Sequence, residues 1–285
     1  MIMLTVLDII QKTTDFLSGK GVDNARLNAE HLVGHALGLP RMQLYLQFER
    51  PLVEEDLEKI RPLVRRRGLR EPLQYIVGTT EFFGVELKVD RRALIPRPET
   101  EHLAAQIVEK LPEPPKTILD LGTGSGALAL SLAQHYKEAK VLATDVSPDA
   151  VALAKENTTA LNLTARVEVS ESDWFASIES GATFDLIVSN PPYLSEQETE
   201  ETLTEVKDFE PRIALTPSGS ESGLESYEIL IREAYDYLAP GGLLAMETGI
   251  AQRAALEEMF TRAAYARHEF VADLTERERF VFAWK

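Results

Sequence analysis

Short apolar runs that alternate with helical patterns occupy the last two thirds of the chain, and this alternation limits the possible folds more than any other feature. The first five runs are Thr117–Leu121, Val141–Asp145, Arg166–Ser170, Asp185–Ser189 and Leu243–Thr248. Helically spaced apolar residues separate most of them. Such alternation predicts a parallel sheet with helices on both faces.

The last two apolar runs are connected differently. Glu269–Leu274 and Arg279–Trp284 are separated by only four residues, whereas a parallel crossover needs about a dozen. We therefore predict that this pair is antiparallel. The expected fold is α/β and Rossmann-like, with a seven-stranded, mostly parallel sheet whose last strand is antiparallel.

The first part of the chain has the spacing of helices. Apolar residues predict helices near Leu4–Leu17, from a cap at Asp23 or Asn24 to Leu37, near Arg41–Phe48, and over Glu54–Arg67. Alternation from Thr80 to Val89 around Gly84 predicts a β-hairpin. Two prolines then delay the next helix until about Glu99. We therefore divide the chain into a helical substrate-docking domain (residues 1–78), a hairpin and proline-rich linker (79–98), and an α/β domain (99–285).

Composition excludes several classes of protein. The chain has no cysteine, which rules out disulfides, thiolate metal sites and a cysteine nucleophile. The N-terminus lacks the basic segment of a signal peptide, and no apolar run approaches the roughly 20 residues of a membrane span. His31 and His35 share a helix face without a third ligand, so we predict no metal site. We expect a cytoplasmic protein that makes no membrane contact and acts as a monomer.

Negative charge is concentrated in the predicted α/β domain. The net charge of the chain is −16, of which residues 1–90 contribute −1 and the remainder −15. A domain of this charge repels phosphate backbones. We therefore expect no tight direct binding of nucleic acid, and a cationic protein partner fits better.

A glycine-rich loop follows the first predicted strand. It consists of Gly122, Thr123, Gly124, Ser125 and Gly126, and a helix is predicted to start directly after it. Glycines allow a sharp turn and a close approach of the backbone to a ligand, while a helix N-terminus offers free N–H donors. Asp145, at the end of the second strand, would bind ribose hydroxyls. The loop and this acid suit S-adenosylmethionine and NAD equally.

Three other residues favour S-adenosylmethionine. Asp120 precedes the loop, where a carboxylate suits the positively charged methionine ammonium but not a diphosphate. Asp173 and Trp174 follow the third strand, and an acid beside an aromatic ring suits an adenine. An ordinary core position explains Trp174 equally well. We expect S-adenosylmethionine as cofactor and S-adenosylhomocysteine as its product.

The segment Asn190-Pro191-Pro192-Tyr193 points to the chemistry. The fourth strand delivers Asn190 at its carboxyl end, where open α/β sheets place their ligands. Two prolines fix the backbone and remove two N–H donors, which leaves the Asn190 side-chain oxygen and the Pro191 carbonyl as rigid acceptors. Tyr193 adds a ring that could lie against a flat group. This set suits an NH2 conjugated to a π system, either a carboxamide or the exocyclic amine of adenine.

An NH2 of this kind is a poor nucleophile, and positioning and electrostatics would supply most of the catalysis. We assign Asn190, Pro191 and Tyr193 as catalytic. All four residues of the segment, including Pro192, are assigned to substrate binding. No strong base is required.

Longer segments resemble a known family. The glycine loop and the Asn190–Tyr193 segment are similar to those of amino-methyltransferases in general. Glu71–Gly78, Glu81–Gly84 and Ile95–Glu101 narrow the resemblance to the PrmC/HemK family, over essentially the whole chain. The resemblance implies the class I methyltransferase architecture and N5-methylation of the glutamine in the Gly-Gly-Gln motif of peptide chain release factors.

The same resemblance implies roles for individual residues. The loop from Gly122 to Gly126, Asp145, Trp174 and Asn190 would contact the cofactor, and the segment from Asn190 to Tyr193 would hold the substrate glutamine. Arg97, Pro98 and Glu99 would border the cofactor pocket, although a helix start fixed by proline explains them almost as well. The chain departs from the family after Asp273-Leu274, where a glycine and a basic pair are usual and Thr275-Glu276-Arg277-Glu278-Arg279 occurs.

Two charged segments are less specific. The first is a set of arginines, for which pairing with nearby glutamates is favoured over a docking surface: Arg61, Arg65, Arg66, Arg67 and Arg70. The second is an acidic run over residues 196–210, directly after Tyr193. Its position slightly favours a loop that receives a cationic partner over a solubilising one.

Two other enzyme classes share parts of these patterns. Adenine-N6 methylation of DNA or RNA uses the same acceptor clamp, but the charge of −15 and the lack of an evident target-recognition insert count against it. An NAD-dependent dehydrogenase shares the glycine loop but gives the Asn190–Tyr193 segment no role. A non-enzymatic binding module would not need that clamp.

Overall fold

The structure is a computed structural model and describes residues 4–217 and 220–285. The chain divides into two compact units. The first unit contains the chain up to Gly78 together with Leu203–Phe209, and the second contains Thr79–Thr202 and Glu210–Lys285. A short piece from the middle of the sequence therefore completes the N-terminal unit.

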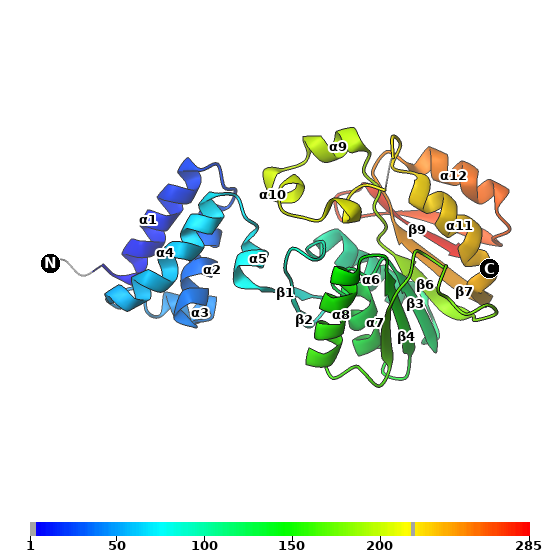
Figure 1. Cartoon of the computed structure of the whole chain (residues 1–285), viewed down its shortest axis with the longest axis horizontal. Helices are drawn as coiled ribbons and strands as arrows, with labels where there is room; N and C mark the ends of the chain where they lie inside the picture. The colour runs from blue at the N-terminus through cyan, green and yellow to red at the C-terminus, as the bar shows by residue number, and fades with distance from the viewer. Residues whose placement is uncertain (1–3, 218–219) are drawn as a thin grey trace. The chain divides into compact units, whose positions relative to one another are not determined.

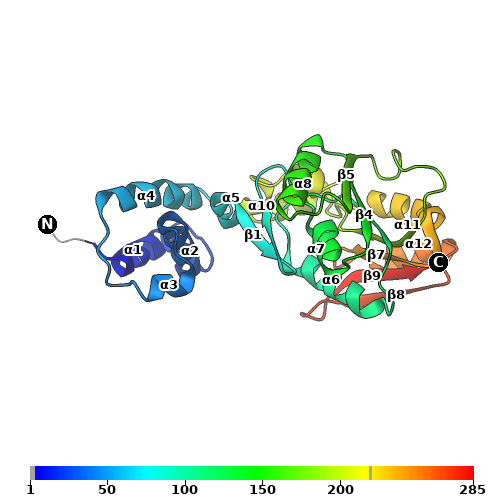
Figure 2. The same cartoon turned by 90° about the horizontal axis from the view of Figure 1, so that it is seen from below.

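The first unit is a small helical bundle. Its helices are α1 (Val6–Gly19), α2 (Ala25–Leu37), α3 (Arg41–Tyr45), α4 (Glu54–Gly68), α5 (Leu73–Val77) and α10 (Thr204–Lys207). Helices α1, α2 and α4 lie side by side (Figures 1 and 2) and enclose a core that includes Val6, Ile10 and Val33. Thr5 and Asp8 cap α1 reciprocally. Asn24 directly precedes α2, but the prediction that its side chain caps this helix is wrong. Its backbone is left-handed (φ 49°), and its side chain makes no cap hydrogen bond.

Glu205 of α10 fastens this helix to the rest of the first unit. Its Oε1 accepts from Nη2 of Arg67 at 2.9 Å, and its Oε2 accepts from Nη2 of Arg70 at 2.7 Å. Arg67 is buried and also donates from Nε to Oδ1 of Asn28 at 2.8 Å. Arg66 pairs with Glu71. Three of the five arginines in the predicted patch therefore serve internal packing.

The second unit contains the predicted sheet, with strand order β5-β4-β3-β6-β7-β9-β8. The strands are β3 (Thr117–Leu121), β4 (Lys140–Asp145), β5 (Val167–Glu171), β6 (Phe184–Ser189), β7 (Leu238–Glu247), β8 (Arg267–Ala272) and β9 (Glu278–Trp284). The first five are parallel, and β9 is antiparallel to both β7 and β8. The predicted Rossmann-like α/β fold is confirmed.

Helices cover both faces of this sheet (Figure 1). Helices α6 (Pro98–Lys110), α7 (Ala127–His135) and α8 (Pro148–Ala160) pack on one face, and α11 (Glu225–Tyr237) and α12 (Arg253–Arg262) pack on the other. Shorter elements are α9 (Glu196–Glu201) and a 3-10 turn at Arg212–Ala214. The order 5-4-3-6-7 places a change of direction between β3 and β6, and doubly wound sheets bind ligands at such a point.

The predicted hairpin consists of β1 (Thr79–Phe82) and β2 (Val85–Lys88). Its two-residue turn, Phe83-Gly84, has positive φ at both positions (44° and 78°), as this tight hairpin requires. Phe82 and Leu87 are buried in the same core as α7. The hairpin is thus a packed part of the second unit. Among the residues that the structure describes, no helix is both long and apolar enough to cross a membrane.

Candidate active site

A cavity of about 410 Å³ lies at the carboxyl ends of β3, β4 and β6, within the second unit. Its volume is in the range of small-molecule sites. Part of its wall consists of residues that the sequence predicted to bind the cofactor: Asp120, Gly122, Thr123, Gly124, Ser125, Asp145, Asp173, Trp174 and Asn190. Residues that are far apart in the sequence therefore meet at one edge of the sheet.

The glycine loop follows the path that its sequence predicts. Gly122, Gly124 and Gly126 all have positive φ (72°, 57° and 87°), a conformation that side chains disfavour. Gly126 does not line the cavity. A Cβ atom there would lie 2.9 Å from Cδ1 of Leu130, so this glycine is needed for close packing at the start of α7.

Asp120 lies at the bottom of the loop and is almost fully buried. Its Oδ2 accepts from the Thr123 hydroxyl at 2.6 Å and from the Ala129 N–H at 3.1 Å. Its Oδ1 is buried without a hydrogen-bond partner. Burial raises the pKa of Asp120 to about 7, against the opposing effect of these hydrogen bonds. A buried acceptor without a partner is costly, and a cationic donor in the cavity would satisfy it.

Asp145, Asp173 and Trp174 form another part of the wall. Both carboxylate oxygens of Asp145 accept from backbone N–H groups, of Gly124 at 2.8 Å and Ser147 at 2.9 Å, which fixes the side chain at the end of β4. Trp174 has a left-handed backbone (φ 46°), and its ring lies 3.9 Å from the position of a Cβ on Gly122. The ring therefore lies over the loop as part of the cavity wall.

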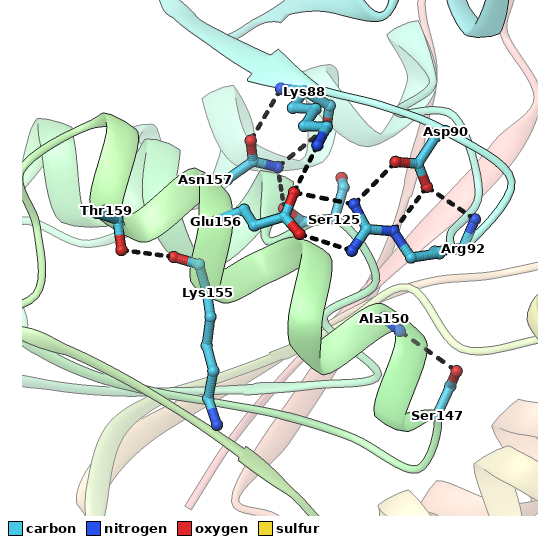
Figure 3. Close-up of polar contacts among 10 residues, drawn as sticks. All are labelled: Lys88, Asp90, Arg92, Ser125, Ser147, Ala150, Lys155, Glu156, Asn157 and Thr159. Carbon is cyan, nitrogen blue, oxygen red and sulfur yellow. Dashed lines mark hydrogen bonds and ion pairs between the residues drawn. The ribbon is translucent and has the colours of Figure 1, made fainter.

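The side chain of Asn157, on α8, is hydrogen-bonded to the glycine loop (Figure 3). Its side chain is buried, accepts from the Lys88 N–H at 2.8 Å, and donates to the carbonyls of Lys88 at 3.0 Å and Ser125 at 2.8 Å. The same view shows Arg92, a cavity residue, clamped between Asp90 and Glu156. Asn157 thus joins the end of β2 to the glycine loop.

We expect the substitution Asn157→Ala to destabilise the second unit. It would leave the Lys88 N–H and the Ser125 carbonyl unpaired, at a cost of about 2–4 kcal/mol in the free energy of unfolding. Both tryptophans, Trp174 and Trp284, are in the second unit, so denaturation followed by tryptophan fluorescence reports on this unit. Thr159→Ala, an exposed change on the same helix, is the control. Equal midpoints for the two variants would contradict the expected role of Asn157.

Asn190 and Tyr193 belong to a hydrogen-bond network that is buried only at Thr100 and Glu247. Asn190 Nδ2 donates to Thr100 Oγ1 at 2.9 Å, and this hydroxyl donates to Glu247 Oε2 at 2.6 Å. Tyr193 donates to Glu247 Oε1 at 3.2 Å. Burial raises the pKa of Tyr193, so its hydroxyl stays protonated. Burial also raises the pKa of Glu247, opposed by the Thr100 hydrogen bond and the Arg279 charge.

Some predicted residues are near the cavity but do not line it. Asn190 and Pro192 line the cavity, whereas Pro191 and Tyr193 do not. The Tyr193 ring packs on the core beneath α11, and the Arg279 guanidinium lies 6.0 Å from its centroid. That the ring lies against a substrate amide stays a prediction.

In the proline-rich segment, too, only some of the predicted residues line the cavity. Arg97 lines the cavity and pairs with Glu210, a buried carboxylate that also accepts from the Ile95 N–H at 3.3 Å. Pro98 is the first residue of α6, and Glu99 lies 3.9 Å from Arg279; neither lines the cavity.

Sequence reasoning missed Thr100 and Glu247. Thr100 lies within a segment that carried the family resemblance but offered no chemical signal of its own. Glu247 ends β7, and the rule that ligands bind at the carboxyl ends of parallel strands could have singled it out. Arg92 was also missed, and nothing in the sequence distinguishes it from other surface arginines. Among the described residues, no group of three or more metal-ligating side chains occurs.

Comparison with known proteins identifies the family. The family model of the PrmC N-terminal domain matches residues 8–78, and that of the methyltransferase small domain matches residues 100–220. The release factor glutamine methyltransferase of Geobacter sulfurreducens is 42% identical over 261 residues, which cover 92% of this chain and 90% of the relative. That of Moorella thermoacetica is 37% identical over 284 residues, with 99% of each chain covered. The chain belongs to the release factor glutamine methyltransferase family.

Solved structures agree with the fold of this family member. A methyltransferase from Pyrococcus furiosus has a TM-score of 0.54 at 22% identity and covers 71% of this chain and 90% of its own. The hMettl16 catalytic domain, solved with an RNA hairpin, has a TM-score of 0.57 at 17% identity and covers 78% and 80%. These likenesses confirm the class I methyltransferase fold.

A methyltransferase of this family and fold uses S-adenosylmethionine as its cofactor, and the cavity residues fit that molecule. The unpaired Oδ1 of Asp120 would accept from the methionine ammonium. Asp145, fixed at the end of β4, would bind the ribose, and Trp174 would contact the adenine. These individual contacts are predictions that follow from the positions of the side chains.

The affinity for S-adenosylmethionine should fall in acid. Asp120 has a raised pKa of about 7 in the free protein, and a cationic ammonium favours its ionised form. The ionised fraction falls from about one half at pH 7 to about one tenth at pH 6, so the Kd should rise about fivefold over this interval. Calorimetric titration at both pH values measures this change in Kd. A pH-independent Kd would contradict the role of Asp120, and the dependence should disappear in Asp120→Asn.

Proposed function

We propose that this protein transfers the methyl group of S-adenosylmethionine to the N5 side-chain amide of the glutamine in the Gly-Gly-Gln motif of peptide chain release factors. The observation that supports this proposal most directly is the hydrogen bonding of the Asn190 side chain. Its amide nitrogen is bound to Thr100, and no described residue donates to its oxygen. The side chain lines the cavity beside the glycine loop.

An acceptor of this kind suits a planar NH2 group. The bound cofactor supplies an electrophilic methyl group. The Asn190 oxygen and the Pro191 carbonyl would each accept one N–H of the substrate amide, which orients its nitrogen and stabilises the positive charge that develops on it. Proline at positions 191 and 192 limits the backbone freedom of these acceptors.

Relatives that cover nearly the whole chain are named for the glutamine of release factors, which favours a carboxamide over the amine of adenine. The charge of −15 on residues 91–285 also opposes the approach of a nucleic acid. We further propose that the enzyme acts as a monomer in the cytoplasm, without tight binding of nucleic acid. The first unit would serve as the docking domain for the release factor.

Mass spectrometry tests this function. The purified protein is incubated with S-adenosylmethionine and a full-length release factor, and the peptide that contains the Gly-Gly-Gln motif is sequenced. We expect methylation on the glutamine side chain, and none in a release factor with alanine in place of that glutamine. Methylation of an adenine-containing oligonucleotide but not of the release factor would refute the proposal.

A further inference from the structure

Two buried side chains, Thr100 and Glu247, connect Asn190 to the end of β7, and Thr100 also lines the cavity. Thr100, on α6, accepts from Asn190 Nδ2 at 2.9 Å and donates to Glu247 Oε2 at 2.6 Å. Thr100 and Glu247 are only 4% and 1% exposed. They are 147 residues apart in the chain, and the network forms only when α6 packs against the sheet.

The direction of these hydrogen bonds defines the orientation of the Asn190 amide. A threonine hydroxyl has one hydrogen to donate. The positive charge of Arg279 favours the ionised form of Glu247, and an ionised carboxylate can only accept. Because the Thr100 hydrogen is directed to Glu247, Thr100 can only accept from Asn190. Asn190 must therefore turn its NH2 group toward Thr100, which leaves its oxygen as the free end of the amide.

Glu247 is itself held at several points. Its Oε1 accepts from the Tyr193 hydroxyl at 3.2 Å, and its backbone carbonyl accepts from the Tyr227 hydroxyl at 3.2 Å. Nη1 of Arg279 lies 3.4 Å from the Tyr193 oxygen and brings a positive charge close to the carboxylate. The carboxylate cannot rotate away from Thr100 without giving up the contact with Tyr193.

We propose that Thr100 and Glu247 are positioning residues, which hold the Asn190 amide so that its oxygen, and never its NH2 group, faces the substrate. The inference rests on the proposed transfer to a carboxamide. A flipped Asn190 would set its NH2 against the NH2 of the substrate, two donors with no acceptor between them. The network removes that unproductive orientation before the substrate binds, in the manner of preorganised sites.

The test compares two substitutions of Thr100 with a matched control. Thr100→Val keeps the shape but removes the hydroxyl, and Thr100→Ser restores it. Thr158→Val is the control, because Thr158 is also buried and its hydroxyl bonds within α8, outside the cavity. Steady-state kinetics with the release factor give kcat and KM. Calorimetry gives the Kd for S-adenosylmethionine, and tryptophan fluorescence monitors folding.

We expect Thr100→Val to lower kcat about tenfold or more, with the Kd for S-adenosylmethionine nearly unchanged and activity recovered in Thr100→Ser. A second variant, Glu247→Asp, keeps the charge but withdraws the acceptor from Thr100, and kcat should fall similarly. Folded Thr100→Val protein with the kcat of the Thr158→Val control would overturn the inference. A wild-type protein that leaves the release factor unmethylated would instead refute the proposed function, which separates the two failures.

Discussion

Asn190→Ala is expected to lower kcat by about 10² to 10³, the usual effect of removing one preorganised polar group from a site where charge develops. The structure leaves its oxygen as the free acceptor at the cavity. The Kd for S-adenosylmethionine should rise less than about tenfold, because only one of many lining residues changes. Single-turnover methylation of the release factor measures the chemical step, and calorimetry measures cofactor binding.

Two further variants test the need for the Asn190 NH2 group and control for the loss of an amide elsewhere. Asn190→Asp has two oxygens and no NH2 to donate to Thr100, so it should also be impaired although it keeps an acceptor. Gln106→Ala removes an amide from α6 outside the cavity and should retain wild-type rates. If Asn190→Ala kept more than about a third of the wild-type rate, the amide clamp would not be the origin of catalysis.

Asp120→Asn is expected to have the largest effect on cofactor binding. The change preserves shape but removes the charge, and it can turn an NH2 toward the ammonium where Oδ1 is now free. Hydrogen bonds to charged groups contribute about 1.5–3 kcal/mol, which corresponds to a rise of about 10- to 150-fold in Kd for S-adenosylmethionine. Calorimetric titration at pH 8, where Asp120 is mostly ionised, measures this directly.

The matched control for this change is Asp185→Asn. Asp185 accepts from the Lys116 N–H at 2.7 Å and the Thr117 N–H at 3.0 Å, outside the cavity. Its loss can reduce stability, but the Kd should stay at the wild-type value. If both variants bound the cofactor equally well, Asp120 would have a structural role only.

Local patterns predicted most of the fold, because strands that are buried on both faces have continuous apolar runs. The run Thr117–Leu121 coincides with β3. By contrast, β7 begins at Leu238, five residues before the predicted start. Pro240-Gly241-Gly242 has the composition of a turn. The pairing of β7 with β6 is irregular between Phe184 and Leu186, and this irregularity accommodates the three residues within the strand. Helix α5 was missed because five residues give too little periodicity.

The candidate site was predictable where chemistry and local geometry coincide. Glycines with positive φ and an acid at a strand end have recognisable positions in the sequence, and they line one cavity. The partners of Asn190 were not predictable, because Thr100 and Glu247 contact it only through tertiary packing. The half-buried Glu205 and the buried Glu210 also look like any other acid in the run 196–210.

Leu203–Phe209 belongs to the N-terminal unit although it is encoded in the middle of the other one. The N-terminal unit is therefore a discontinuous domain, and no single cut of the chain separates the two units. A truncated enzyme that starts at Thr79 would keep this heptapeptide but lose Arg67 and Arg70, the partners of Glu205. The heptapeptide leads directly into Glu210 and Pro211, where the cavity wall resumes. Deletion studies of the N-terminal unit would thus perturb the catalytic unit through the backbone itself, and point substitutions are the cleaner way to separate docking from catalysis.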